Sequence, residues 1–471
     1  MFEAMFPDSK IAKGYRQSET KSKYTIQYGI FPYLKTLLLE DLNDTVFTFK
    51  FDESTNQQVN KQYDGYVQYW SRKHKCIKIA YCGTVMVDHC TAEKSLEHFL
   101  ELVEKVKLNI KFMLHIGMDG PNVNIKFERL LKSSEKMKNL NKNIISIGTC
   151  PLHIVHNAFR AGVNVLNFNI DSFAIDVNFF FKHSAARRSD YRQIEDLPET
   201  ISHLIQRHSS TKWVTLRSIC SQILEQHKNL CEYFIKFLPT TTSFKSTVRD
   251  TERYKRITDI LQNKISMPYI SFIAFIANDF EIFLKTFQSI KPRIHLIYSE
   301  MSKLFVALMS KFIKTKLLYV NNNGSNSIKS INELLMIDVI DSKNCKPLKL
   351  IDIGTKAKSY FSEALEISYC EKKFRQNCLE SYQAFTSYLK LKLPWELTIL
   401  KNAIFLDPLK KGSNESLAAV SNLTLEVCKS LEVVLCKVFP SCSSKEEVCD
   451  IVRSEWRIYQ MELLPECYYK C

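Results

Sequence analysis

The sequence predicts a mixed α/β protein, in which a small sheet near the N-terminus is followed by a larger all-helical part. Two observations favour this fold class. Between residues 46 and 87, three segments alternate apolar and polar residues with a period of two, which is typical of strands. Beyond residue 150 apolar residues recur at helical spacing, and Gly (11) and Pro (13) are too scarce in 471 residues for collagen-like, linker-rich or many-stranded architectures.

Each element of the first 150 residues follows from a local pattern. The first strand, Val46–Asp52 (VFTFKFD), has Phe47, Phe49 and Phe51 on one face. The remaining elements follow in the order strand, strand, helix, strand, helix, strand: Tyr63–Ser71, Cys76–Val87, Ala92–Lys107, Phe112–Met118, Pro121 to about Leu131, and Ile144–Gly148. Three antiparallel strands followed by βαβ units predict a mixed sheet with helices.

The chain is therefore expected to have four parts. They are a basic leader (1–29), an α/β core (30–150), a helical insertion (151–440) and a C-terminal tail (441–471). Within the helical part, Leu348–Ile353 (LKLIDI) is the one predicted strand. Because no apolar run reaches the roughly 18 residues of a membrane span, no membrane partner is expected.

Charge and cysteine content bear on partners and compartment. Lys plus Arg number 65 and Asp plus Glu 50, a formal charge of +15 that permits a polyanion partner without proving one. The 15 cysteines are odd in number, and the N-terminal residues lack the apolar core of a signal peptide. We expect free thiols in a reducing compartment, hence a protein that is not secreted. The absence of any CxxC pair predicts no zinc site.

Two acids end predicted strands. Asp52 closes the first strand and Asp119 closes the fourth, with Gly120 allowing the chain to turn. Carboxylates at neighbouring strand ends can hold Mg²⁺ or Mn²⁺, and a pair of such ions stabilises the attacking and leaving oxygens of a phosphodiester. On spacing alone, a capping or turn-forming role explains these two aspartates more simply.

Several motifs in one order resemble the hAT superfamily of DNA transposases. They are DESTN (52–56), KQYDGYVQYW (61–70), MDGPNVN (118–124), CPLHIVH (150–156), SAARRSDY (184–191), TKW (211–213), LDP (406–408) and EWRIYQMELLP (455–465). The resemblance implies an RNase H-like mixed sheet with a large all-helical insertion, in a nuclear protein that binds DNA. It implies that Asp52 and Asp119 are catalytic metal ligands, that Cys150 and His153 form the CxxH pair, and that Lys212 and Trp213 lie near the DNA end.

The resemblance also leaves parts unmatched. Neither the N-terminal BED zinc finger nor the helix bearing the third catalytic Glu is found, and the sequence ends before the family's dimerisation region, which leaves oligomerisation open. Glu53 alternates to the opposite strand face from Asp52. Four later acids stand outside the family context: Glu415, Glu426, Glu455 and Glu462. We therefore expect a transposon-derived protein without competent chemistry, with Mg²⁺ or Mn²⁺ as cofactor only if it is active.

The densest basic group after the leader is KHSAARR, which contains Lys182, Arg187 and Arg188. In a transposase-like insertion these residues contact DNA phosphates, whereas such groups are more often solvated surface. Trp213 is either a base-stacking residue or a core residue, and Cys150 with His153 are either packing residues or half of a metal site. Two alternatives stay open for the whole protein: a protein-interaction scaffold with no nucleic-acid role, and an active nuclease whose third acid comes from elsewhere in the chain.

Overall fold

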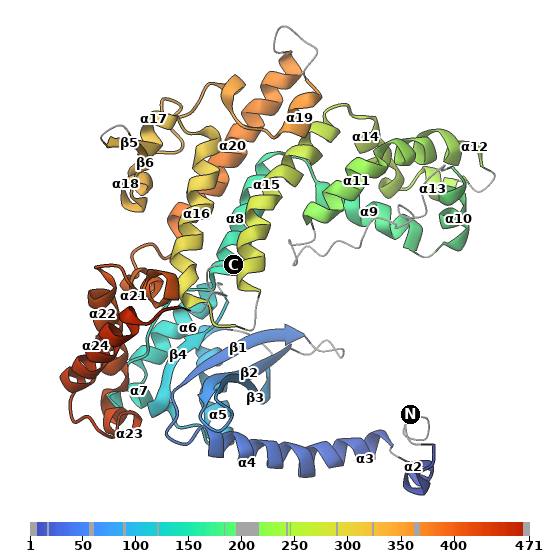
Figure 1. Ribbon diagram of the computed structural model, residues 1–471. Coiled ribbons are helices and arrows are strands. Elements are labelled where there is room, and N and C mark those ends of the chain that lie inside the picture. The colour runs from blue at the N-terminus through green and yellow to red at the C-terminus, as the bar shows by residue number, and fades with distance from the viewer. Residues whose placement is uncertain are drawn as a thin grey trace. The chain divides into compact units, whose positions relative to one another are not determined.

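A computed structural model describes residues 7–16, 18–55, 61–87, 91–119, 122–182, 184–194, 216–241, 244, 246–288, 291–322, 325–361 and 368–464. Residues 12, 52, 55, 122, 246–247, 321–322 and 325–326 are described by their backbone alone. Two compact units account for the chain (Figure 1). The first, the sheet unit, combines Met1–Cys150 with Phe405–Cys471, and the second, the helical unit, is Pro151–Ile404. The division after Cys150 coincides with the predicted boundary.

The sheet unit contains a four-stranded mixed sheet. Its strands are β1 (Phe47–Thr55), β2 (Lys61–Ser71), β3 (Cys76–Val87) and β4 (Met113–Gly117), in the order β3-β2-β1-β4. β2 is antiparallel to both β1 and β3, whereas β4 is parallel to β1. The predicted fifth strand at 144–148 is reduced to one parallel bridge between His115 and Ile145. The predicted α+β class is therefore confirmed.

Helices cover one face of this sheet. Helices α5 (Ala92–Val106) and α6 (Asn122–Ser133) supply Phe99 and Phe127, whose rings pack edge-on against the buried Phe49 and Phe51. Gly65 is required where α5 crosses β2, because a β-carbon there would collide with the Leu102 side chain. α7 (Glu135–Asn139) lies between α6 and Ile145, the residue that forms the isolated parallel bridge with His115.

The leader is helical for much of its length. After the short α2 (Lys10–Gly14), one continuous helix comprises α3 (Glu19–Tyr24), a π-helical segment (Thr25–Ile30) and α4 (Phe31–Asp41). Its residues at the junctions keep right-handed helical dihedrals, so the axis is not interrupted. Figure 1 shows α3 and α4 running as one rod that extends beyond the sheet.

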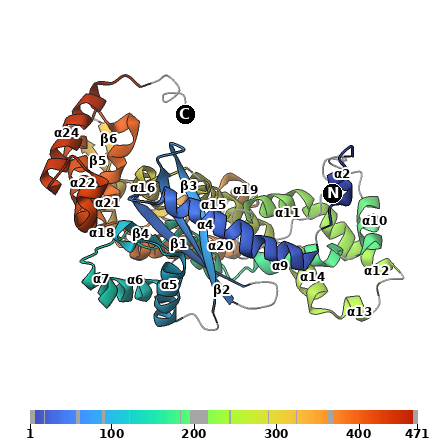
Figure 2. The ribbon, with the colours of Figure 1, turned by 90° about the horizontal axis from the view of Figure 1, so that it is seen from below.

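The C-terminal helices belong to the sheet unit, which corrects the expected end of the insertion at residue 440. Helices α22 (Ser416–Leu431), α23 (Leu435–Val438) and α24 (Lys445–Met461) follow the return of the chain at Phe405, and Figure 2 shows α22 beside α24. Leu431 and Val434 are buried in the core of the sheet. Ser430 Oγ donates to the Asn143 carbonyl at 2.7 Å. Residues 405–440 therefore belong to the sheet unit and not to the helical unit.

The helical unit is organised around two long core helices, α15 (Ser266–Phe287) and α20 (Tyr369–Lys392). The other helices of this unit are α8 (Pro151–Val165), α9 (Ile170–Lys182), α10 (Ala185–Gln193), α11 (Leu216–Cys231), α12 (Leu238–Thr240), α13 (Ser246–Arg249), α14 (Glu252–Gln262), α16 (Ile294–Phe312), α17 (Thr315–Leu318), α18 (Ile331–Met336), α19 (Thr355–Ser359) and α21 (Thr398–Ala403). The strand predicted at Leu348–Ile353 is wrong, because Leu348–Leu350 forms a 3₁₀ turn. An unpredicted hairpin, β5 (Tyr319–Asn322) and β6 (Ser325–Ile328), occurs instead.

One helix departs from the expectation about apolar length. α15 is long and apolar enough to cross a membrane by length and composition, the one such helix within the described ranges. About two-thirds of its apolar window is buried inside the unit. Phe272 and Phe280 of α15 pack there against Tyr382 and Phe385 of α20. Its apolar character is thus accounted for by core packing.

Candidate functional site

The neighbouring ends of β1 and β4 bring the two predicted acids to one edge of the sheet. In the parallel pairing of these strands, Lys50 is the register partner of Gly117. Asp52 lies two residues after Lys50 on β1, and Asp119 lies two residues after Gly117, where β4 ends, so the backbone places them at the same level.

The carboxylate of Asp119 is half-buried and held by the first turn of α6. The Asn124 side-chain amide donates to Asp119 Oδ1, and more weakly to its backbone carbonyl at 3.5 Å. In the part of the chain that is described, no donor reaches Oδ2 of Asp119. One oxygen is therefore fixed in orientation while the other is free to accept a cation or a proton donor.

Asp64 is a third acid in the same row, and the sequence analysis did not single it out. It is the cross-strand partner of Asp52 in the β1–β2 ladder. Its oxygens accept hydrogen bonds from Ser54 Oγ at 3.2 Å, from Gln62 Nε2 at 2.8 Å and from the Thr84 hydroxyl. The alternation of β2 was the signal that could have found it, because Asp64 lies between the buried Tyr63 and Gly65.

Lys50 is the charged residue of β1 that lies beside the end of β4. Its side chain lies over Gly117, where an added β-carbon would come within 3.2 Å of Lys50 Cγ. Burial lowers the pKa of Lys50, and the nearby Cys150 thiol partly opposes that shift. Lys50 therefore carries its ammonium group in surroundings that disfavour uncompensated charge.

Few side chains near Asp52 and Asp119 could bind a divalent cation. No group of three or more His, Cys, Asp and Glu side chains suited to a metal occurs among the residues whose side chains are described. Of the four late acids, Glu415, Glu455 and Glu462 are exposed, whereas Glu426 is half-buried on α22, which packs against β4. Hard carboxylate oxygens at Asp119 and position 52 suit Mg²⁺ or Mn²⁺, and neither supplies the soft or imidazole donors that zinc prefers.

The CxxH pair is divided between the two units. Cys150 is the last residue before the helical unit, and its thiol lies near Lys50. His153 belongs to α8, the first helix of the helical unit. On that helix, burial lowers the pKa of His156 to about 4, with a further contribution from His153. His156 is therefore uncharged at neutral pH.

Both arginines that were predicted to contact DNA also stabilise a helix end. Arg187 donates to the Phe180 carbonyl at 3.1 Å, and Arg188 donates to the Phe181 carbonyl at 2.9 Å and to the Lys182 carbonyl. These are carbonyls of the last turn of α9, which a cation is well placed to satisfy. The Lys182 side chain is exposed. Lys212 and Trp213 lie outside the described residues.

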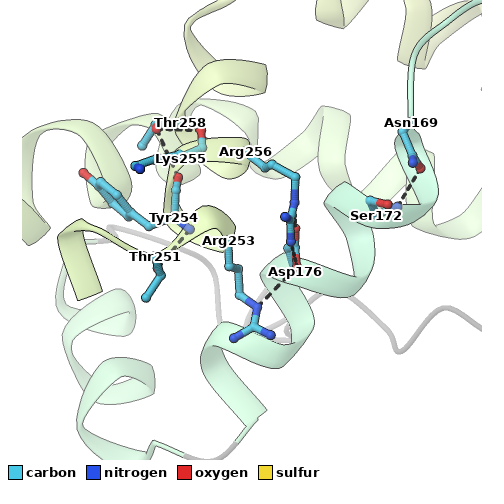
Figure 3. Close-up of polar contacts among 9 residues, drawn as sticks. All are labelled: Asn169, Ser172, Asp176, Thr251, Arg253, Tyr254, Lys255, Arg256 and Thr258. Atoms are coloured by element: carbon cyan, nitrogen blue, oxygen red, sulfur yellow. Dashed lines mark hydrogen bonds and ion pairs between the residues drawn. The ribbon is translucent and has the colours of Figure 1, made fainter. Parts of the chain in front are cut away.

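Helix α14 adds two arginines that the sequence analysis did not select. The buried Asp176 of α9 accepts from Arg256 at 2.8 and 3.0 Å and from Arg253 at 3.2 Å, as Figure 3 shows. The Arg253 guanidinium also lies 4.2 Å from the Phe179 ring centroid. We call the combined set the α9–α10–α14 basic surface: Lys182, Arg187, Arg188, Arg253 and Arg256. Its four arginines are held by internal bonds, and both guanidiniums of α14 stay partly exposed.

Comparison with models of known protein families and with characterised proteins finds no match to this chain. The chemistry must therefore be inferred from the two features described above. They are the row of acids on the sheet unit and the basic surface on the helical unit.

Proposed function

We propose that the protein is a hAT transposase-like protein with an RNase H-like core, which binds a divalent cation and DNA but does not cleave DNA strands. The observation that carries this proposal is the topology around Asp52 and Asp119. Strand order β3-β2-β1-β4, with β4 parallel to β1, supports an RNase H-like arrangement with both acids at adjoining strand ends. The chain leaves this unit after Cys150 and returns at Phe405, which supports a helical insertion.

Asp52 and Asp119 are the residues that would hold Mg²⁺ or Mn²⁺. When bound, such a cation stabilises negative charge that develops on phosphodiester oxygens. Asn124 orients the Asp119 carboxylate through Oδ1. The role of the protein side chains is therefore to hold and orient one cation close to a DNA phosphate.

The proposed lack of cleavage follows from the hydrogen bonds that already occupy the third acid, Asp64. Asp64 is the nearest candidate by register, yet its oxygens already accept bonds from three side chains. A metal ligand there would require that network to break. Groups that act as a catalytic unit fail together when one is missing, so two acids give far less than a proportionate share of activity.

The α9–α10–α14 basic surface is the proposed DNA contact. Arginine side chains on phosphates position DNA without reading its sequence, so binding should be nonspecific and should weaken with salt. A nuclear location is part of this proposal, since DNA is the partner.

A DNA cleavage and binding assay on the full chain tests the proposal. We expect labelled duplex DNA to bind with an affinity that falls steeply between low and physiological salt, and to stay intact with Mg²⁺ or Mn²⁺. Robust nicking that vanishes in Asp52→Asn but persists in Glu53→Gln would overturn the inactive interpretation. Glu53 is a matched control because it is the adjacent residue, exposed and paired with Lys61 at 2.5 Å. Failure to bind DNA at all would favour a scaffold.

A second candidate, an active nuclease, is favoured by one observation. Glu426 is half-buried on α22, the helix of the sheet unit that packs against β4. If Glu426 supplies the third carboxylate, cleavage should occur in the wild-type chain and be lost in Glu426→Gln, while Glu455→Gln keeps it. Glu455 is exposed on α24 and serves as the control.

A further inference from the structure

One face of the sheet packs against helices, and the other carries accessible aromatic and aliphatic side chains of the β2–β3 hairpin. The alternation of β2 places Tyr63, Val67 and Tyr69 in the core, whereas the residues that alternate with them point to the other face. We call the large side chains on that other face the aromatic platform: Tyr66, Trp70, Ile77, Ile79 and Tyr81. Four of them keep between 38% and 53% of their surface exposed, although they lie in regular strands.

The platform residues share one face, because the strand register pairs them directly. Trp70 is the cross-strand partner of Ile77, and Tyr66 is the partner of Tyr81. The rings of Tyr66 and Tyr81 meet edge to face, with their centroids 5.7 Å apart. Ile79 lies between these two pairs along β3. Since side chains of directly opposed residues lie on the same side of a sheet, the platform is one continuous strip across both strands.

The charge of the same hairpin is entirely positive. Between Asp64 and Asp88 the sequence contains no acidic residue but four cations: Arg72, Lys73, Lys75 and Lys78. The turn that joins β2 to β3, residues 72–75, is exposed throughout. The platform therefore ends at a basic turn. Aromatic side chains beside a concentration of positive charge are complementary to the bases and the phosphates of a nucleic acid strand.

A groove continues the platform at the edge of the sheet. It lies between α4 and β3 and has a volume of about 610 Å³, and two platform residues, Ile79 and Tyr81, are part of its lining. Cations outnumber acids among its charged lining side chains: Lys35, Arg72, Lys73, Lys78, Glu40 and Asp41. One of the two acids, Asp41, is already bonded to Tyr69 and Ser71. A hollow of this volume is in the range of small-molecule sites and has room for a nucleotide.

We propose that the aromatic platform binds single-stranded DNA, whose bases stack on Trp70 and Tyr81 while its phosphates contact the basic turn. Stacking needs only the π-face of a base, so binding of this kind tolerates any sequence. The bases of a duplex already stack on one another, and a paired strand therefore has no free ring to offer. The choice of DNA rests on the proposed function, which uses a different surface for duplex DNA.

The size of the platform favours unpaired bases over a protein partner. With about half of a roughly 200 Å² side chain exposed, four residues present roughly 400 Å², half of the ~800 Å² per partner that a stable protein interface buries. Two or three stacked bases need no larger surface.

The platform also leads to the row of acids. The Tyr81 hydroxyl and Thr84 Oγ1 share a 2.6 Å hydrogen bond, and the Thr84 hydroxyl donates to Asp64. Asp64 is in turn the register partner of Asp52. A single strand that lies along the platform therefore runs toward the candidate cation site.

Fluorescence anisotropy of a labelled oligothymidylate of about 12 nucleotides, titrated with the full chain, tests the proposal. We expect Trp70→Ala and Tyr81→Ala each to weaken binding by about 10- to 100-fold. Trp70→Phe keeps an aromatic ring and should retain most of the affinity. Met86→Ala is the matched control, because Met86 is 52% exposed on the same strand but offers no ring, and its loss should leave the affinity unchanged. Circular dichroism of each variant establishes that it folds.

The salt dependence of the same titration tests the basic turn. Lys73→Ala and Lys75→Ala should each lower the affinity and reduce the slope of log affinity against log salt by about 0.7, the value for one phosphate contact of a single strand. Slopes equal to that of the wild type in both variants would overturn the assignment of the turn to phosphates.

A comparison with duplex DNA separates this site from the proposed duplex contact. Trp70→Ala should weaken only the binding of oligothymidylate, and Lys182→Ala only the binding of duplex. Loss of duplex binding alone would contradict the proposed function and leave the platform intact. Oligothymidylate binding that is insensitive to both Trp70→Ala and Tyr81→Ala would overturn the platform. No binding of oligothymidylate would also overturn it, in favour of a protein partner, and at least ~10-fold tighter binding of an RNA oligomer of equal length would assign the platform to RNA.

Discussion

Removing the Asp176 carboxylate should destabilise the helical unit by about 3 kcal/mol. Asp176 is 4% exposed and receives three charge-assisted hydrogen bonds from Arg253 and Arg256. Breaking a fully buried pair costs ~3–5 kcal/mol, and the lower end applies because the guanidiniums, 38% and 50% exposed, can rehydrate. Arg253 also keeps its stacking on Phe179. In a unit of the size of Pro151–Ile404, the loss corresponds to roughly 5–10 °C in Tm.

Differential scanning calorimetry of Asp176→Ala measures this loss directly. The control is Glu252→Gln on the same α14, because the Glu252–Lys255 pair is exposed on both sides and its loss should cost under ~1 kcal/mol. A double-mutant cycle with Arg256→Ala should show that the two losses are not additive, because both substitutions break the same ion pair. A melting temperature of Asp176→Ala within about 1 °C of wild type would refute the reasoning that this carboxylate fixes α14 on α9.

Three further predictions concern packing, pH and the basic surface. Gly162→Ala in α8 should cost ~1–3 kcal/mol in urea unfolding, because its β-carbon would collide with the Phe385 ring, whereas Gly412→Ala, with nothing within 4 Å, should be nearly neutral. Burial lowers the pKa of Lys142 to about 8, below its unfolded value, so the unfolded state binds more protons. This residue's contribution to stability should therefore rise by about 1 kcal/mol from pH 7 to 9. That rise should vanish in Lys142→Met, measured as the pH dependence of the free energy of unfolding relative to wild type. Arg188→Ala should lower both Tm and DNA affinity, because Arg188 also caps α9. Lys182→Ala should leave Tm unchanged and lower only the DNA affinity and its salt dependence. Equal losses of Tm in both variants would contradict this assignment.

The sheet could be predicted largely from the sequence because its strands have one buried and one accessible face. Phe47, Phe49 and Phe51 mark the covered side of β1 by simple alternation, and the ladders preserve it. The region 144–148 lacks such alternation and forms a single bridge in place of a strand. Leu348–Ile353 alternates equally well but forms a 3₁₀ turn, because a short apolar run does not determine the backbone without pairing partners.

Long-range packing was beyond the reach of local patterns. The return of the chain to the sheet after Ile404 depends on Leu431 and Val434, which look like any helical core residues in sequence. Asp64 becomes notable only through its register with Asp52, and Arg253 and Arg256 only through their shared partner Asp176 on another helix. Each of these relations joins segments that are far apart along the chain or on different strands.

The central claim is that Asp52 and Asp119 together hold a divalent cation. Electron paramagnetic resonance titration of Mn²⁺ with the full chain tests it most directly, because free and protein-bound ions give distinct signals. We predict one saturable site that Mg²⁺ displaces, with affinity at least ~10-fold lower in Asp119→Asn and in Asp52→Asn. Glu53→Gln should bind Mn²⁺ as the wild type does. Equal Mn²⁺ affinity in the wild type and both aspartate variants would contradict the claim.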